Sequence, residues 1–469
     1  MKISFRLIIA ALAATVALAA CTKEITPGKV DTDPKAPAAE GSRVIAVSFA
    51  PQTKTSLAND GLQPRFNDGD SILISNGEAL DTCEVKIIGK KATISTDLTG
   101  PLTAAYPAKL AKIKDGEFDG FDIPAMQSGK FSDANLCYAE MEGKDESSLH
   151  FENCCPVLKF YVDESIGVKS IQIASDLHIA GNSMKITVEA PEGKTLYDVM
   201  PSEGQDKRIC YVALSSKDVH SNQLKFETET ATQGTVTRTP TNNVLLKEGH
   251  MYNAFIPYYI EVNGQKWAYC NIGAFLPEEP GYYFSWGNTQ GYVYDGQNWV
   301  SAPGGQTVLG GGFTEENYAG TTGSSISGSS LKVDVTEDAA CAAWGGKWRI
   351  PTSQEYQNLF NACVGVDGYD TTTKPTTGTP SAKGVYWCDS YDGVAGCLFC
   401  DVTSKLFFPA AGEGEDTSLL GLGSGGIYWS NTLCTSNTDY AYALGFESGI
   451  YPQNKTGSLR RIFLSIWAH

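Results

Sequence analysis

The sequence predicts a mainly β protein in which two tandem β-sandwich domains are followed by an α+β domain. Between residues 44 and 257, apolar side chains recur at every second position in short runs separated by Gly, Pro, Asn and Asp, which is typical of antiparallel strands. All eight tryptophans lie at or beyond Trp267, where two helical patterns also occur. We therefore predict domains at residues 43–149, 150–258 and 259–469, after a signal peptide at 1–20 and a flexible tether at 21–42.

The alternation of apolar and polar residues predicts where the strands of the two sandwiches lie along the chain. No helix of three turns with an apolar stripe is expected in either sandwich. The expected strands lie near residues 45–49, 72–74, 85–87 and 94 in the first domain, and near 157–162, 171–173, 184–188, 224–226, 236 and 251–255 in the second.

The third domain combines helices with short strands. Residues 338–344 form one expected helix, ended by a Gly-Gly pair. Thr352 and Glu355 form a capping box that starts a second helix. The buried face of this helix carries residues at i, i+3, i+4 and i+7, namely Tyr356, Leu359, Phe360 and Cys363. Short strands are expected at 348–350, 406–408, 427–429, 441–446 and 462–467, with long loops at 289–331 and 364–385.

The N-terminus has the pattern of an export signal. Lys2 and Arg6 precede an almost wholly apolar stretch over residues 7–20, which ends at Cys21. At about 14 residues this stretch is shorter than a membrane-spanning helix needs. The cysteine resembles that of the lipobox of bacterial lipoproteins, which implies that the signal is removed and that Cys21 carries the lipid anchor in the outer membrane. The alternative is an ordinary signal peptide with a chance cysteine.

The amino-acid composition indicates the class of protein and argues against some classes of partner. Hydrophobic residues make up 42% of the chain and charged residues 19%, which is typical of a globular protein. The formal net charge of −17 argues against nucleic acid or anionic lipid as a partner.

Several stretches in the two sandwiches resemble the fimbrillin-like family of lipoprotein pilins. They are residues 49–57 with the later Gly69-Asp70 pair, residues 104–108 with 123–127, and residues 249–255. Just before the Gly-Asp pair, where the family usually has tryptophan, this chain has Phe66. The resemblance implies two transthyretin-like sandwiches, export as a lipidated precursor, and assembly with other pilin subunits by donor-strand exchange.

The same resemblance implies a protease cut after an arginine that frees the strand-accepting groove. Arg43 stands just before the first expected strand and is the candidate processing site; the alternative is an exposed linker residue. Strand exchange is physically reasonable, because a sandwich that lacks a strand exposes apolar side chains and unpaired backbone groups that a donor strand satisfies.

Residues 265–467 resemble a different family, the Fibrobacter major paralogous domain. That resemblance implies a fold similar to those of C-type lectins and formylglycine-generating enzymes. The cysteine pattern of these enzymes is not recognisable here, so enzymatic activity is not implied. The matching stretches follow the order of the family: 267–274, 283–287, 348–352 with Glu355 and Leu359, 408–412, 428–430 and Arg461.

No catalytic or metal-binding constellation is recognisable. A nucleophile–histidine site needs a histidine base, and the third domain has only His469 at the chain end. Residues 397–400 form a CxxC pair without a second pair, so we expect buried apolar thiols rather than zinc ligands. Glu413, Glu415 and Asp416 lie in a glycine-rich loop, where we expect a solvated turn and a calcium site is the alternative. We predict neither an enzyme nor a bound cofactor or metal.

Aromatic and acidic residues on polar loops are the candidate ligand-binding residues. Exposed aromatic side chains supply rigid contact area; the alternative is that the rings pack over a small core. They form two groups: Tyr292, Tyr294 and Trp299 in one loop, and Asp389, Tyr391 and Asp392 in another.

The leading hypothesis is an adhesive pilus subunit at the cell surface. The two sandwiches would form the pilin body, and the C-terminal domain would bind an unknown host or bacterial glycan or protein. A pilin ordinarily gives its C-terminal strand to a neighbour, so an extra domain at that end favours the tip of the pilus. The alternative is a surface lipoprotein that binds glycan or protein without polymerising.

Overall fold

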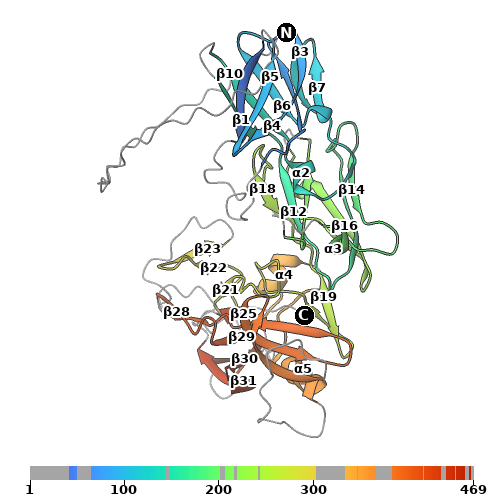
Figure 1. The fold of residues 1–469 in the computed structure, drawn as a ribbon. Coiled ribbons are helices and arrows are strands. Elements are labelled where there is room, and N and C mark those ends of the chain that lie inside the picture. The colour runs from blue at the N-terminus through green and yellow to red at the C-terminus, as the bar shows by residue number, and fades with distance from the viewer. Residues whose placement is uncertain are drawn as a thin grey trace, which may run out of the picture.

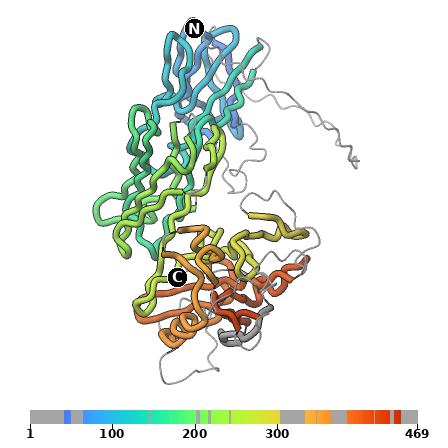
Figure 2. The backbone as a smooth tube through the Cα atoms, turned by 180° about the vertical axis from the view of Figure 1, so that it is seen from behind, coloured from blue at the N-terminus to red at the C-terminus, as the bar shows by residue number. Residues whose placement is uncertain are grey.

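The computed structural model confirms that the protein is mainly β. Three units follow one another along the molecule, from the first strands at the top of Figure 1 to the last strands at the bottom, and Figure 2 shows the same order from behind. The structure describes residues 42–49, 65–143, 147–200, 206–215, 219–240, 243–302, 333–345, 347–364, 383–415, 417–434, 440–448, 450–459 and 464–465.

The first unit is built on one eight-stranded sheet. Alternate side chains of its strands are buried, as in β1 (Arg43–Phe49) and β5 (Lys91–Thr96). Phe66, which stands where the resembled family has tryptophan, is 8% exposed and stacks on Phe49 with ring centroids 4.3 Å apart. The helix η1 (Ala108–Leu110) and the hairpin β7 (Ala111–Lys114) and β8 (Glu117–Phe121) complete the unit. The strand order is β3 (Leu80–Glu84), β2 (Ser71–Ser75), β6 (Leu102–Tyr106), β10 (Cys137–Met141), β11 (Ser148–Asn153), β1 (Arg43–Phe49), β5 (Lys91–Thr96) and β4 (Lys86–Ile88).

The second unit, the second sandwich, encloses its core between two sheets. The three-stranded sheet has the order β15 (Ile209–Ala213), β12 (Val157–Tyr161) and β18 (Met251–Asn253). The five-stranded sheet has the order β17 (Gly234–Arg238), β16 (Leu224–Thr230), β13 (Val168–Ser175), β14 (Lys185–Glu189) and β9 (Met126–Gln127). The short helices α2 (Phe131–Ala134), α3 (Leu196–Val199) and η2 (Ser221–Gln223) belong to it.

A segment that precedes β10 packs into the second sandwich, and we call these residues, 121–136, the strap. The carbonyl of Ala125 accepts a hydrogen bond from the Thr187 N–H in β14 (2.7 Å). The Gln127 side chain exchanges two hydrogen bonds with the backbone of Ala213 in β15 (2.8 and 3.0 Å). The strap therefore bridges both sheets of the second sandwich. The chain connects the first unit and the second sandwich three times: where it enters the strap, where it leaves the strap, and between β11 and β12.

In the described residues of the C-terminal unit, the elements are two larger sheets, two ribbons and two helices. The seven-stranded sheet has the order β23 (Trp299–Ala302), β22 (Gly291–Tyr294), β21 (Tyr283–Phe284), β32 (Leu464–Ser465), β29 (Gly425–Leu433), β30 (Tyr440–Glu447) and β31 (Ile450–Leu459). The three-stranded sheet is β24 (Gly384–Tyr391), β25 (Val394–Cys400) and β26 (Lys405–Pro409). The ribbons are β19 (Tyr259–Val262) with β20 (Gln265–Ala268), and β27 (Glu413–Glu415) with β28 (Ser418–Leu420); the helices are α4 (Ala339–Trp344) and α5 (Ser353–Val364).

Both helices predicted for the C-terminal unit are confirmed, with their caps. The Asp338 carboxylate accepts a hydrogen bond from the Ala340 N–H (2.9 Å) at the start of α4. At the start of α5, the Glu355 N–H donates to Thr352 Oγ1 (3.1 Å) and the Thr352 N–H donates to Glu355 Oε2 (2.8 Å). This reciprocal pair is the capping box that the sequence predicts.

Two expectations for the C-terminal unit are wrong. Residues 348–350 are not a strand, because the Ile350 N–H donates to the Asp338 carboxylate (2.9 Å) instead of a neighbouring strand. The expected loop over residues 289–331 contains the hairpin β22–β23, because Asp295 closes a tight turn there, as described below.

The three units have separate cores. Their buried apolar residues lie within residues 45–151, 105–274 and 262–446. The ranges overlap because Ala105, the strap and three residues after β20 (Tyr269, Cys270 and Ala274) pack into the core of the second sandwich. Among the described residues, no helix is long and apolar enough to cross a membrane. The expected signal peptide, Cys21 and nearly all of the tether lie outside the described residues.

Candidate functional site: hairpins and junction of the C-terminal unit

The first group of candidate ligand-binding residues lies on the hairpin β22–β23. The Asp295 carboxylate closes the turn by accepting hydrogen bonds from the N–H groups of Gln297 (2.9 Å) and Asn298 (2.7 Å). These backbone hydrogen bonds lower the pKa of Asp295. The turn fixes the register in which Tyr294 lies opposite Trp299.

The three aromatic residues of this group form a small cluster with Tyr283 and Leu419. Trp299 is 1% exposed, and its ring centroid lies 5.2 Å from that of Tyr283 and 5.1 Å from that of Tyr294. Trp299 therefore packs in a small core, which is the alternative that the sequence analysis left open. Its ring has no exposed face that a ligand could contact. Tyr292 and Tyr294 are half-buried, and burial raises the pKa of Tyr292.

The second group lies on the hairpin β24–β25 and belongs to a different cluster. Tyr391 stacks on Phe407 with ring centroids 4.2 Å apart, and burial raises its pKa. Asp389 is exposed and accepts a hydrogen bond from Trp387 Nε1 (2.6 Å). Asp392 occupies the turn, with φ at +46°, and contacts the second sandwich.

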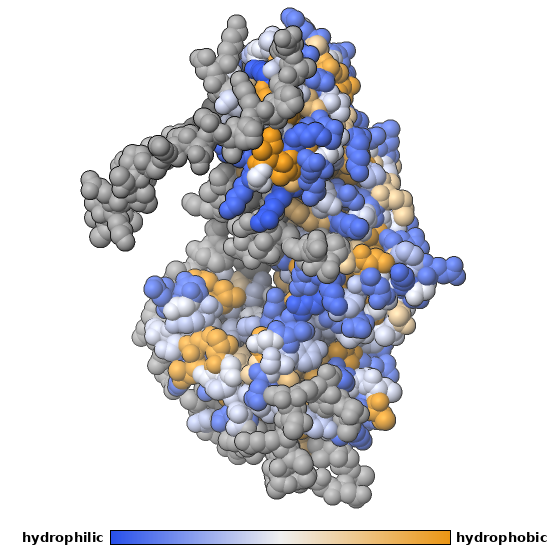
Figure 3. Space-filling view, viewed as in Figure 1, coloured by the Kyte–Doolittle hydropathy of each residue, from blue (hydrophilic) through white to orange (hydrophobic). Residues whose placement is uncertain are grey.

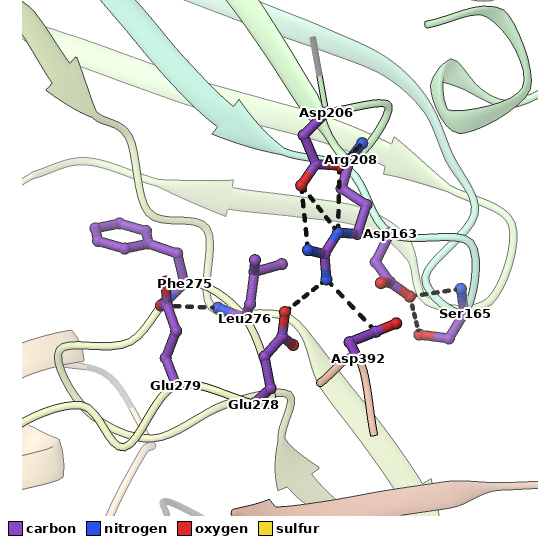
Figure 4. Close-up of polar contacts among 9 residues, drawn as sticks. All are labelled: Asp163, Ser165, Asp206, Arg208, Phe275, Leu276, Glu278, Glu279 and Asp392. Carbon is purple, nitrogen blue, oxygen red and sulfur yellow. Dashed lines mark hydrogen bonds and ion pairs between the residues drawn. The ribbon is translucent and has the colours of Figure 1, made fainter. Parts of the chain in front are cut away.

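Arg208 is the second-sandwich residue that Asp392 contacts (Figure 4). Arg208 Nη1 lies 2.6 Å from Glu278 Oε1 and 3.5 Å from Asp392 Oδ2, and Nη2 lies 3.1 Å from Asp206 Oδ2. The side chain of Glu278 is 9% exposed and that of Arg208 is 21% exposed. One guanidinium thus neutralises carboxylates from three chain segments, two of which belong to the C-terminal unit.

Burial and charge oppose each other in this cluster. Burial raises the pKa of Glu278, and the hydrogen bond from Arg208 only partly offsets the rise. Burial also opposes ionisation of Asp206, but hydrogen bonds from the side chain and backbone of Arg208 lower its pKa overall. Loss of the guanidinium would leave the carboxylate of Glu278, whose side chain is 9% exposed, without its cation in a poorly hydrated place.

Aromatic rings make a second contact between the second sandwich and the C-terminal unit. Phe255 stacks on Trp344 of α4 with ring centroids 5.1 Å apart, and Phe275 stacks on Tyr161 of β12 at 5.2 Å. The Arg238 guanidinium carbon lies 5.0 Å from the Phe255 ring centroid, and burial lowers the pKa of Arg238 to about 10. The C-terminal unit is therefore held to the second sandwich by an ionic cluster and by stacked rings, in addition to the apolar residues after β20 that pack into the core of the second sandwich.

The acidic residues of the glycine-rich loop form part of a ribbon. Glu413 and Glu415 lie in β27, whereas Asp416 lies outside the described residues. Within the described part of the chain, no three His, Cys, Asp or Glu side chains are grouped so that they could hold a metal ion. Of the CxxC pair, Cys397 belongs to the main core and Cys400 to a smaller cluster. Burial raises the pKa of the Cys400 thiol to about 11.

Arg43 is the first residue of β1. Its Nη2 donates a hydrogen bond to the Gly100 carbonyl (3.1 Å), and the residue lies opposite Thr96 of β5. Arg43 is half-buried and belongs to the folded strand rather than to an exposed linker. Processing at this residue stays a prediction.

Apart from Asp392, the junction residues described above are not among the sequence candidates. Arg208 is separated from Glu278 by 70 residues and from Asp392 by 184, and no spacing rule links residues so far apart. The two hairpins do have a local signal. Asp295-Gly296 and Asp392-Gly393 are Asp-Gly pairs beside strand-forming residues, which is typical of tight hairpin turns.

Comparison with protein-family models finds no match, and comparison with curated proteins finds none either. Two solved structures are remotely similar. One is a candidate cell adhesion protein from Bacteroides ovatus, with 14% identity and a TM-score of 0.29 over 45% of this chain and 89% of that chain. The other is a candidate adhesin from Bacteroides thetaiotaomicron, with 14% identity and a TM-score of 0.21 over 42% of this chain and 79% of that chain.

Proposed function

We propose that this protein is a cell-surface adhesion subunit, exported as a lipoprotein through Cys21. In this proposal the first unit and the second sandwich form the stem, and the C-terminal unit presents the binding surface without catalysing a reaction. One observation supports it above the others. β18, the last strand of the second sandwich, pairs in parallel with β12, and the chain that follows it is fastened to the C-terminal unit by the stacking of Phe255 on Trp344.

A strand can be given to a neighbouring subunit only if it leaves its own sheet. Release of β18 would have to break its pairing with β12, and the stacking of Phe255 on Trp344 ties the chain just after β18 to the C-terminal unit. A subunit that accepts a strand in its first unit and gives none ends a fibre. We therefore propose the tip of a pilus as its position and other pilin subunits as its partners.

Immunogold labelling with an antibody against the C-terminal unit tests the position. We expect gold particles at pilus ends, because a subunit that donates no strand cannot lie within the shaft. Labelling along the whole shaft would contradict the proposal.

A second candidate function is a surface lipoprotein that binds glycan or protein without polymerising. It is supported by β1, which pairs with both β5 and β11, so that the first unit has no vacant strand position where β1 lies. Electrophoresis of surface extracts without boiling separates the two candidates. A pilus subunit gives a ladder of stable polymers, whereas a lone lipoprotein gives one band.

A further inference from the structure

A groove lies where the first unit meets the second sandwich, and we call it the strap groove. Its volume is about 630 Å³, and it is lined by Leu110 of η1, by strap residues 122–125 and by residues 180–183 of the loop between β13 and β14. Ligand pockets commonly have volumes of about 300–1,000 Å³ and often lie between domains. In Figure 3, hydrophilic and hydrophobic residues lie side by side on the flank where Figure 1 labels β14.

Hydrogen bonds fix the walls of the strap groove. The Asp122 N–H donates to the Leu110 carbonyl (2.7 Å), which ties the strap to the first unit. On the opposite wall, the backbones of Ala180 and Ser183 exchange two hydrogen bonds (2.7 and 3.1 Å) that close a tight turn. The groove is therefore formed before a ligand arrives, which lowers the entropy lost on binding.

Gly181 allows this turn to lie against Asp122. Gly181 has φ at +53°, and a Cβ atom there would lie 2.9 Å from Asp122 Oδ1. The carboxylate thus lies against the bare backbone of the turn, beside the residue that precedes Asn182. Two polar side chains from segments about 60 residues apart, Asp122 and Asn182, therefore line one groove.

The hydrogen-bonding capacity of these two side chains is available to a ligand. Among the described residues, neither the Asp122 carboxylate nor the Asn182 amide makes a hydrogen bond or an ion pair, and both residues are exposed. A carboxylate only accepts hydrogen bonds, whereas an amide both donates and accepts them. Neighbouring hydroxyl groups on one ligand satisfy both side chains, because each hydroxyl can donate to the carboxylate or accept from the amide.

The rest of the lining narrows the class of ligand. Pro124 and Ala125 are exposed and offer small apolar surfaces. No lysine or arginine lines the groove, so an anionic group there would meet the Asp122 carboxylate without a cation. The lining also lacks the aromatic and arginine side chains that usually anchor protein partners. A sugar ring, which carries hydroxyl groups at its rim and C–H groups on its faces, matches this lining.

We propose that the strap groove binds a saccharide unit that carries no acidic group. Asp122 accepts hydrogen bonds from its hydroxyl groups, the Asn182 amide donates to a neighbouring hydroxyl oxygen, and Pro124 and Ala125 contact its C–H groups. The inference goes beyond the proposed function, which gives the binding surface to the C-terminal unit, because it gives the stem a ligand site of its own.

Saturation-transfer NMR with the full chain tests the proposal. The probes are the methyl glycosides of glucose, galactose, mannose and N-acetylglucosamine; methyl glucuronide is the acidic comparison, and a short lysine peptide is the cationic one. We expect transfer to at least one uncharged glycoside and weaker transfer to the glucuronide. For the glycoside that binds, we expect D122N to weaken binding and D122A/N182A to lose about tenfold or more in affinity, because hydrogen bonds to a charged group are the stronger ones.

The matched control is Asp176→Ala, because Asp176 is exposed in the same loop but does not line the groove. D176A should bind as the unchanged protein does, and all variants should melt at the same temperature because the altered side chains are on the surface. No transfer to any uncharged glycoside, equal affinity in every variant, preference for the glucuronide, or a lysine peptide that displaces the glycoside from Asp122 would overturn the inference. Labelling of pilus ends does not depend on this groove, so failure here would leave the proposed function standing.

Discussion

Arg208 carries the ionic contact between the second sandwich and the C-terminal unit, so its removal tests how firmly they are joined. We expect Arg208→Met to lower the free energy of unfolding by about 2 kcal/mol, because a part-buried carboxylate left without its cation is costly. Lys169→Met is the matched control, since the Lys169–Glu229 pair lies at 3.6 Å between side chains that are 48% and 56% exposed. Such surface pairs contribute less than about 1 kcal/mol. Equal losses in the two variants, measured by denaturant unfolding, would contradict the role given to Arg208.

Asp206 makes the same cluster sensitive to acid. Its pKa in the folded protein lies below the ordinary value of 3.8. Its contribution to stability is therefore present above pH 3.8 and is lost as the pH falls through the lowered value. We expect Asp206→Asn to be less stable than the unchanged protein at pH 7, with a gap that narrows below about pH 4. Unfolding free energies measured between pH 3 and pH 7 check this, and a constant gap would show that the carboxylate charge is not what stabilises the cluster.

For the candidate residues, the sequence predicts which of them are neighbours but not which of them are buried. The sequence places Trp299 and Tyr294 together, but cannot show that Tyr283 and Leu419, from distant segments, cover the Trp299 ring. Burial depends on which segments meet in three dimensions. The same limit applies to Asp392, whose partner Arg208 comes from another unit.

Among the elements, the strap is one that the sequence does not predict, and Gly129 tests its fit. Gly129 has φ at +79°, and a Cβ atom there would lie 2.8 Å from Cys210 Sγ and 3.0 Å from Met200 Cε. We expect Gly129→Ala to cost about 3 kcal/mol, from backbone strain and overpacking together. Gly193→Ala is the matched control, because Gly193 has a similar φ of +76° with no atom within 4 Å of the added Cβ. Its cost should be about 1 kcal/mol from strain alone, and denaturant midpoints that fall equally would contradict the tight fit.

Elements with local signals are predicted well, and elements set by long-range contacts are not. Helix α5 follows from its capping box and from a buried face that repeats at helical spacing. Residues 348–350 alternate like a strand, but the Asp338 carboxylate takes the hydrogen bond of Ile350 that a strand would need. The strap has too short a regular pattern to indicate which sandwich it joins.

Over the whole molecule, the ionic cluster, the stacked rings and the apolar packing of Tyr269, Cys270 and Ala274 predict a fixed arrangement of the second sandwich and the C-terminal unit. We expect small-angle X-ray scattering of the full chain to fit one arrangement of these parts. The double variant R208M/F255A removes the ion pairs and the stacked ring, so its scattering should require a mixture of arrangements. A mixture for the unchanged protein would contradict the fixed junction.

The path of the chain through the strap has a mechanical consequence. Two bodies joined by a single connection can swivel about it, but these two are joined by three passes of the backbone, two of them at the ends of the strap. Torque applied to one body is therefore transmitted to the other instead of being lost in rotation. A force applied to the C-terminal unit, such as drag in flowing liquid, would therefore reach the first unit without rotation between the first unit and the second sandwich.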